Sequence, residues 1–302
     1  MNKKSRTLVI LLAVLVVFAA LYALLRYIST QKEQEEEASI QAGITYVSQL
    51  EDATSLSYHS EDEDLSFTLN NGVWSYDADP DFPLDQSKVG LIASALKNLT
   101  ATRTLENGED SSAYGFDAPS FTLEAKNAAG DTLTLVVGSM ASNGDYYVMR
   151  EGEEGIYTIS SSLPQQFTGL YSFYSLPVIP YSGCTADTVN ATGSLAGGSG
   201  ISLSGLAESD SDEASAFKSA WTSLAFDSCF AYHPDEATLS QCGLATPALS
   251  VEVSYAEGAA STLLIGAQND AGDYYARLGT DGDICILPQL QVTSLLSALG
   301  IS

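Results

Sequence analysis

An internal repeat is the feature that most constrains the fold of this chain. Residues 114–159 align without a gap on residues 242–287 when the sequence is displaced by 128 positions, and residues 95–101 match residues 220–226 at a displacement of 125. Turn residues and alternating apolar residues fall into register together, which predicts one structural unit that occurs twice. The identical pairs include Gly115/Gly243, Pro119/Pro247, Gly130/Gly258, Gly138/Gly266, Gly144/Gly272 and Tyr146/Tyr274.

Both copies show the same succession of elements. Apolar residues at helical spacing predict a helix over Asp85–Leu99 in the first copy and over Asp212–Leu224 in the second. Alternating apolar residues, bounded by turns that contain glycine, then predict four strands in each copy. In the first copy these strands are Phe121–Lys126, Thr132–Val137, Tyr146–Arg150 and Ile156–Ile159.

An apolar helix is expected to close each copy, over Leu163–Tyr171 in the first and Leu290–Leu299 in the second. A hairpin of Leu65–Leu69 and Val73–Tyr76 precedes the first copy, and Thr192–Leu206 is expected to be its looser counterpart. Hairpins with segregated helices are typical of the α+β class. The expected fold is therefore an N-terminal transmembrane helix followed by two tandem repeat domains, each an antiparallel sheet plus helices.

The N-terminus predicts a membrane anchor. Residues 7–28 form an apolar segment whose one charged residue is Arg26. As a helix this segment would extend for about 33 Å, enough to cross the hydrocarbon core of a bilayer. Basic residues at positions 3, 4 and 6 then place residues 1–6 in the cytoplasm and the bulk of the chain outside. The alternative is a cleaved signal peptide, which the long apolar run and the lack of a small-residue cleavage site disfavour.

The charge is very uneven along the chain. The formal net charge is −26, and the first 32 residues carry five basic residues and no acidic one, which leaves −31 for residues 33–302. So negative a surface repels phosphate backbones and argues against nucleic-acid binding. Residues 29–42 are charged helix formers without an apolar stripe, which predicts a short solvated stalk between the anchor and the outer region.

Candidate catalytic residues are scarce. The chain has two histidines, His59 and His233, and neither lies near a Gly-x-Ser-x-Gly motif. Nucleophilic catalysis needs a Ser or Cys with a base within hydrogen-bond reach, and a transition-metal site usually needs more histidines than these. Both histidines are therefore interpreted as surface or strand-end residues, and no catalytic or cofactor-binding residue is assigned.

Calcium is the metal that best suits so acidic a chain. Asp77, Asp79 and Asp81 have the opening spacing of an EF-hand loop, but Phe82 stands where glycine is needed and Lys88 stands where the bidentate glutamate belongs. The acidic stretches 208–213 and 281–283 are interpreted as a solvated helix start and a simple turn. No metal ligand is assigned.

Aromatic residues and cysteines have structural interpretations. The pairs Tyr146-Tyr147 and Tyr274-Tyr275 follow Gly-Asp turns, so one ring of each pair is expected to pack inward and the other to cover the sheet. Trp74 and Trp221 are expected in the cores. The four cysteines are Cys184, Cys229, Cys242 and Cys285. Disulfides and free buried thiols both remain open, and Cys242 with Cys285 is one pairing to consider because they replace Tyr114 and Tyr157 of the first copy.

The segment NNGVWSYDADPDFPLDQSKVGLIASALKNLTATR, followed by YGFDAP, a strand ending in VVG, and GDYYV, resembles the domain-of-unknown-function family 4340. The resemblance covers about 55–170 well and 183–299 more weakly, because the second copy has Cys242 in place of the tyrosine and lacks the tryptophan-bearing spacer. The resemblance implies a membrane-anchored, extracytoplasmic, β-rich protein without an assigned activity. Some relatives are encoded beside ABC transporters of the gliding-motility type, which suggests transporter subunits as partners.

The expected organisation is a cytoplasmic tail (1–6), an anchor (7–28), a stalk (29–42), repeat domain one (43–176), a Pro-containing linker (177–182) and repeat domain two (183–302). The expected function is that of a non-catalytic accessory or interaction protein at the cell membrane, working by binding and possessing no cofactor. One alternative is a ligand-binding module with an apolar pocket between the copies. The other is an envelope hydrolase that uses a pair of acidic residues.

Overall fold

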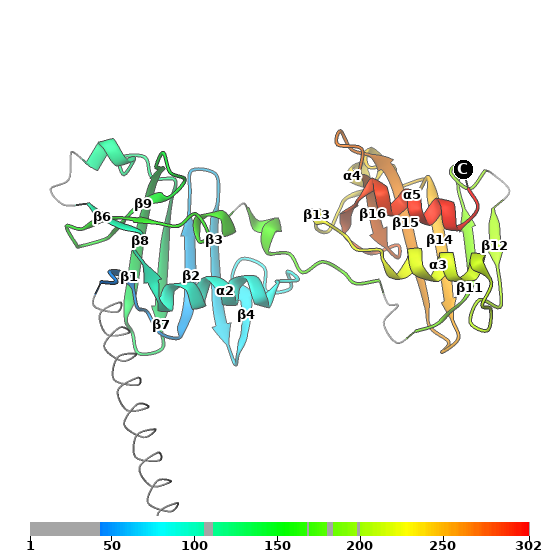
Figure 1. Cartoon of the computed structure of the whole chain (residues 1–302), viewed down its shortest axis with the longest axis horizontal. Coiled ribbons are helices and arrows are strands. Elements are labelled where there is room, and N and C mark those ends of the chain that lie inside the picture. Colours follow the sequence, from blue (N-terminus) through cyan, green and yellow to red (C-terminus); the bar gives the residue numbers. More distant parts are fainter. Residues whose placement is uncertain (1–42, 106–110, 168, 180–183, 198–199, 302) are drawn as a thin grey trace, which may run out of the picture.

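The computed structural model describes residues 43–105, 111–167, 169–179, 184–197 and 200–301 (Figure 1). The expected tail, anchor and stalk, residues 1–42, lie outside these described residues. Within the described ranges, no helix has both the length and the apolar character needed to cross a membrane. The described fold is mixed α+β with antiparallel sheets, as predicted.

The first sheet has eight strands. Their bounds are β2 Ala53–His59, β3 Asp64–Asn70, β4 Val73–Tyr76, β6 Arg103–Leu105, β7 Phe121–Asn127, β8 Thr132–Met140, β9 Tyr146–Arg150 and β10 Ile156–Ile159. The spatial order is β4-β3-β2-β7-β8-β9-β10-β6. Helix α2 (Gln86–Lys97) lies across one face, with Asp85 capping its first turn and Val89, Ile92 and Leu96 buried against the sheet. Two short strands, β1 (Tyr46–Ser48) and β5 (Leu99–Thr100), pair with each other and form a separate two-stranded sheet.

The second sheet has seven strands. Their bounds are β11 Ala186–Thr192, β12 Ile201–Leu203, β13 Ser228–Ala231, β14 Leu249–Tyr255, β15 Ala260–Gln268, β16 Tyr274–Leu278 and β17 Ile284–Leu287. The spatial order is β12-β11-β14-β15-β16-β17-β13. Helices α3 (Asp212–Thr222) and α5 (Gln289–Ala298) lie side by side on one face, and the short α4 (Glu236–Gln241) precedes β14 (Figure 1). We call each sheet with the segments that cover it a unit.

The two sheets correspond strand by strand. Strands β7 to β10 and β14 to β17 have the same bounds when displaced by 128 positions, and so does the pairing register between β7 and β8 and between β14 and β15. A bulge interrupts the next pairing at equivalent places, between Val137 and Met140 and between Ile265 and Gln268. The predicted repeat register of 114–159 with 242–287 is therefore the register of the two sheets.

A glycine in each unit explains part of this correspondence. A Cβ atom on Gly138 would lie 2.2 Å from the carbonyl oxygen of Tyr114, and one on Gly266 would lie 2.1 Å from that of Cys242. Both approaches are far closer than a real Cβ contact allows. The turn before β7 and the equivalent turn before β14 therefore lie directly against the bulge in β8 and in β15, and glycine is required there in both units.

One predicted element of the repeat is wrong, and another is right only in part. The segment Leu163–Tyr171 forms no α-helix, because Pro164 and Gly169 divide it into short 3₁₀ turns, η2 (Pro164–Gln166) and η3 (Leu170–Phe173). The stretch Thr192–Leu206 is the looser counterpart of the hairpin only in part, because it contains the end of β11 and then β12, which takes the place of β3. Strand β4 has no counterpart among the described residues of the second unit.

Both tryptophans lie in the cores, as predicted. Trp221 is 1% exposed, and its indole N–H donates a hydrogen bond of 3.0 Å to the Tyr255 hydroxyl. Trp74 is also buried, and its backbone N–H and carbonyl both bond to the side-chain amide of Gln86, which ties β4 to the start of α2. Each unit therefore closes its helix onto the sheet through a tryptophan.

Candidate functional site at the junction of the two units

The residues singled out from the sequence for chemistry do not come together. His59 is the exposed last residue of β2 and contacts Asp64 of the first unit, whereas His233 follows β13 in the second unit. His233 is exposed and stacks on the neighbouring Tyr232, with ring centroids 3.9 Å apart. Neither histidine has a nucleophilic side chain among its hydrogen-bond partners, so their interpretation as surface and strand-end residues is confirmed.

The Asp77–Asp81 segment forms a turn and no cation loop. The Asp79 carboxylate accepts a hydrogen bond of 3.1 Å from the Asp81 backbone N–H, and the Asp79 carbonyl accepts one from Phe82. Throughout the described ranges, no three side chains of the His, Cys, Asp and Glu types are grouped so that they could hold a metal ion. The effect of the turn is to direct the Phe82 ring towards the second unit.

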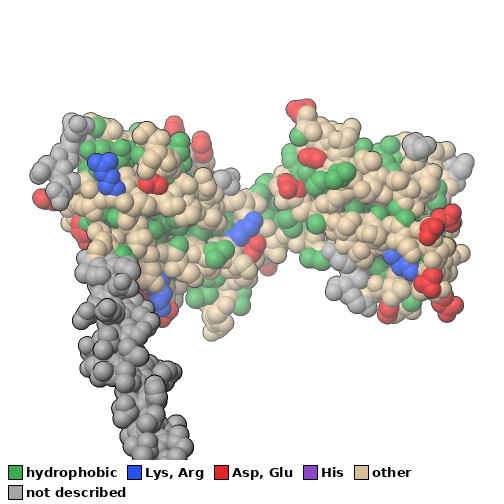
Figure 2. Space-filling model, in the orientation of Figure 1, with side chains coloured by type: hydrophobic (Ala, Val, Ile, Leu, Met, Phe, Trp, Pro, Cys, Tyr) green, Lys and Arg blue, Asp and Glu red, His purple; other side chains and the backbone are tan. Residues whose placement is uncertain are grey.

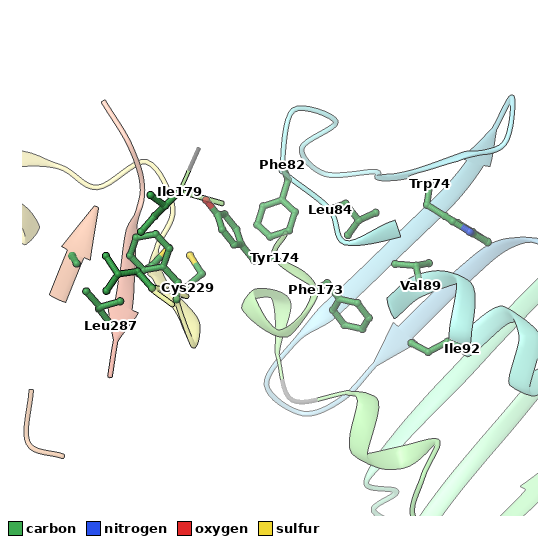
Figure 3. Close-up of a cluster of buried hydrophobic side chains, with 14 of the residues drawn as sticks. Trp74, Phe82, Leu84, Val89, Ile92, Phe173, Tyr174, Ile179, Cys229 and Leu287 are labelled. Atoms are coloured by element: carbon green, nitrogen blue, oxygen red, sulfur yellow. The ribbon is translucent and has the colours of Figure 1, made fainter. Parts of the chain in front are cut away.

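The most elaborate arrangement lies where the two units meet (Figure 3). Three aromatic rings converge there, from the loop before α2, from the segment after η3, and from the segment after β13. The Phe82 ring packs edge-on against Tyr174 and Tyr232, with centroid separations of 5.7 and 5.2 Å. Tyr174 and Tyr232 are 6.4 Å apart. Edge-to-face pairs at such separations are favourable beyond the area that they bury.

One carboxylate bridges the two units at this cluster. The Tyr174 hydroxyl donates a hydrogen bond of 2.5 Å to Oδ2 of Asp283, and the His233 backbone N–H donates one of 2.8 Å to Oδ1. Burial, and then the bond to Asp283, raise the pKa of Tyr174 far above its usual value of 10. Burial, followed by the carboxylate of Asp79, also raises the pKa of Tyr232. Both phenols therefore remain neutral hydrogen-bond donors at physiological pH.

The segment that carries Tyr174 is fixed from both sides. On the first unit, the backbone N–H of Asp85 donates to the Phe173 carbonyl at 2.7 Å, and the Lys88 ammonium donates to the Ser172 carbonyl at 2.5 Å. Towards the second unit, Ile179 is 1% exposed and lies beside Cys229 and Leu287 (Figure 3). The described part of this segment is thus anchored in the first unit at Phe173 and Tyr174 and in the second at Ile179, whereas Val178 between them is exposed.

The tyrosine pairs behave as structural residues, as predicted. Tyr146 and Tyr274 pack against the main core on the helix side of their sheets. Tyr147 and Tyr275 lie on the opposite face, where Tyr147 packs against Tyr114 and Tyr275 against Phe230, with centroids 4.8 and 4.7 Å apart. All four rings are half-buried.

Three cavities lie within single units. One of about 780 Å³ is bordered by β1, the loop that follows it and the β7–β8 turn, and its lining includes Glu51, Asp131 and Arg150. A second, of about 400 Å³, lies between α2 and β4 beside Trp74. A third, of about 550 Å³, is a shallow groove between α3 and α5. None of these three is the apolar pocket between the copies that a ligand-binding module was expected to have.

The junction residues were not found from the sequence. The sequence marks Phe82 only as the wrong residue for a calcium loop, and Asp283 only as part of a turn. Tyr174 and Tyr232 belong to no motif. No local pattern signals them, because these residues meet only when four segments far apart in sequence come together.

The fold and the junction define a two-unit α+β protein whose equivalent sheets are held against each other by an aromatic and hydrogen-bonded contact. The family model of the domain of unknown function (DUF4340) matches residues 74–171, from Trp74 on β4 to Tyr171 in η3. The resemblance to that family is thereby confirmed for this part of the first unit. Comparison with curated proteins and with solved structures gives no significant match.

Proposed function

We propose that this chain is a non-catalytic, membrane-anchored accessory protein whose two tandem repeat domains lie outside the cell membrane and work by binding another protein. The junction carries the proposal. Tyr174, Asp283 and the aromatic cluster hold two equivalent sheets as one body. A preorganised surface loses less conformational freedom on binding than two independent units would, so a larger part of the contact energy remains as affinity.

The proposed anchor comes from the sequence of residues 7–28, with residues 1–6 on the cytoplasmic side. A topology experiment tests it directly. A Ser60→Cys variant in a Cys184→Ser background should react with a membrane-impermeant maleimide in intact cells, because Ser60 lies at the accessible end of β2. Labelling only after the cells are lysed would refute the proposed location.

The partner should carry a basic outer face. The outer region has a formal charge of −31, and exposed acidic side chains gather around the start of α3, at Glu208, Asp210, Asp212 and Glu213. Figure 2 shows acidic side chains at that end of the second unit and few basic ones. Complementary charge accelerates association and makes it sensitive to salt. The resemblance to family 4340 suggests ABC-type transporter subunits as the partner.

Crosslinking in native membranes followed by mass spectrometry tests the function. We expect the full-length chain to be crosslinked to a membrane protein, with a yield that falls as salt rises and falls further in a Tyr174→Phe variant. Tyr147→Phe is the matched control, because within the described residues the Tyr147 hydroxyl makes no hydrogen bond, and its ring, on β9, packs against Tyr114 and takes no part in the junction. Recovery of the chain alone, together with turnover of a wall polysaccharide by the same preparation, would refute the proposal in favour of a hydrolase.

The hydrolase alternative has no support from the two carboxyl groups whose pKa departs from its usual value. The pKa of Asp235 is lowered, chiefly by the Thr238 hydroxyl, and the pKa of Glu257 is lowered by the backbone N–H of Thr185. A general acid needs a pKa shifted upward.

A ligand-binding module is the second candidate, and the cavity beside β1, with Glu51, Asp131 and Arg150 in its lining, favours a small polar ligand over an apolar one.

A further inference from the structure

Two of the four cysteines lie directly opposite each other in the second sheet. Cys229 on the edge strand β13 is the register partner of Cys285 on β17, and the two strands are antiparallel. Both side chains belong to the main core on the helix side of the sheet. The other two cysteines lie elsewhere, since Cys184 precedes β11 and Cys242 packs with Leu244 and Ile284.

The structure argues against a disulfide between Cys242 and Cys285, which the sequence left open. Cys285 faces the main core on the helix side of the sheet, whereas Cys242 belongs to the smaller cluster on the other face. Ile284, the residue before Cys285, is the one that contacts the Cys242 cluster. A strand directs consecutive side chains to opposite faces, so these two sulfur atoms cannot meet without a change of register.

The backbone at Cys229 and Cys285 already suits a disulfide. Opposite residues of an antiparallel pair have Cα atoms about 4.5–5.5 Å apart, and a disulfide bridges Cα atoms about 4.4–6.8 Å apart. No movement of the strands is needed. In the first unit the equivalent pair is Thr104 with Tyr157, so the second unit has cysteine at both positions of a single cross-strand pair.

We propose that Cys229 and Cys285 are joined by a disulfide in the mature protein, which is a covalent link between β13 and β17. The proposal rests on the proposed location outside the membrane, where disulfides persist. The oxidant is a protein or small-molecule disulfide of that compartment. One thiolate attacks it to give a mixed disulfide and release one thiol, and the second thiolate then displaces the other thiol. Two cysteine thiols lose two protons and two electrons, and the oxidant takes up both as two thiols.

The bond forms before the sheet edge closes. Cys229 is 7% exposed and Cys285 is completely buried in the folded chain. The hydrogen bond with Cys229, and then burial, raise the pKa of Cys285, so its thiolate is scarce once β13 has docked. Because β13 is a four-residue edge strand, it can pair late, and oxidation belongs to that stage of folding. The proposed bond is therefore structural and not a rapid redox switch.

The link would secure the junction. Strand β13 leads directly into Tyr232 and His233, which contact Phe82 and Asp283, and β13 also contacts η3 of the first unit. An edge strand of this length is held on one side only, by β17. The disulfide would prevent β13 from fraying and carrying its half of the contact away from the first unit.

The test uses the full-length chain in native membranes. Free thiols are blocked with N-ethylmaleimide during lysis, and the protein is digested without reductant and analysed by mass spectrometry. We expect one linked pair of peptides that contains Cys229 and Cys285, with Cys184 and Cys242 alkylated. Alkylation of both Cys229 and Cys285, or a link that involves Cys184 or Cys242, would overturn the proposal. The Ser60→Cys labelling reports the location independently, so a failed disulfide and a wrong location are told apart.

The melting temperature of the unmodified protein gives a second measurement. Closing a loop from residue 229 to residue 285 should raise the melting temperature by about 10 °C, so reductant should lower it by that amount. A Cys229→Ser/Cys285→Ser variant should melt at the lower temperature with or without reductant. The matched controls Cys184→Ser and Cys242→Ser should keep the full response to reductant. No effect of reductant on the unmodified protein would contradict the proposed bond.

Discussion

Replacing Tyr174 by phenylalanine removes a single oxygen atom from the junction. The ring is 5% exposed and keeps its contacts with Phe82 and Tyr232, but the bond to Oδ2 of Asp283 is lost. A hydrogen bond to a charged group contributes about 1.5–3 kcal/mol. We take a value in the lower half of this range, about 2 kcal/mol, because Oδ1 of Asp283 keeps its bond to the His233 backbone N–H.

The expected effect is an easier separation of the two units without unfolding of either one. A loss of about 2 kcal/mol increases the open population about 30-fold, since about 1.4 kcal/mol corresponds to a factor of ten. Hydrogen exchange followed by mass spectrometry measures this. Amides of β13, of His233 and of Leu170–Phe173 should exchange about 30-fold faster, whereas amides of β7 and β14 in the two sheet centres should not change.

Tyr147→Phe is again the control, and it should leave exchange at β13 and η3 unchanged. Two results would refute the reasoning. One is unchanged exchange at the junction in Tyr174→Phe, which would mean that the bond to Asp283 does not hold the units together. The other is equal acceleration in β7 and β14, which would mean that the variant destabilises the whole fold.

Two further predictions concern pH and glycine. The pKa of Tyr174 is raised in the folded chain, so the contribution of Tyr174 to the free energy of unfolding should be present below pH 10 and be lost as the pH rises above 10. Urea unfolding at a series of pH values should show this decline. A decline of the same size in Tyr174→Phe would contradict it. Gly138→Ala should lower the free energy of unfolding by several kcal/mol, because the new Cβ meets the Tyr114 carbonyl. Gly130→Ala, with open space around it but a φ of +92°, should lower it by about 1 kcal/mol. Equal losses in thermal melting would refute the proposed close approach.

The strands of the repeat were predictable because their patterns are local. The stretches 121–159 and 249–287 alternate apolar and polar residues between glycine turns, and glycine at 138 and 266 marks the same close approach in both units. The helices α2, α3 and α5 were predictable for a similar reason, since each has an apolar stripe at helical spacing, and Asp85 and Ser211 cap two of them.

The helix over Leu163–Tyr171 was a wrong prediction from a correct observation. Leu163, Phe167 and Leu170 have helical spacing, yet Phe167 stacks on Tyr58 at 4.6 Å while Pro164 and Gly169 divide the chain into separate turns. The apolar spacing reflects a segment that crosses the sheet, in which each aromatic residue fills one position of the core. Periodicity alone cannot distinguish the two arrangements in so short a run.

The junction and the cysteine pair could not be predicted, because both depend on long-range register. Cys229 meets Cys285 only because β13 pairs with β17 in one particular alignment, and β13 is too short to be recognised by alternation. Tyr174, Tyr232 and Asp283 meet only after both sheets have formed.

The segment from Leu163 to Ile179 imposes an order on folding. Its first part completes the core of the first unit with Leu163 and Phe173, and its last described residue, Ile179, is buried beside β13 and β17 of the second. Long-range pairing is slow because the intervening loop must close first, and domains that leave a ribosome or a translocon fold from the N-terminus onward. The first unit therefore folds before the edge of the second unit, which then packs against it. A chain interrupted before β17 would leave Ile179 and Tyr174 exposed as an apolar surface that is prone to aggregation.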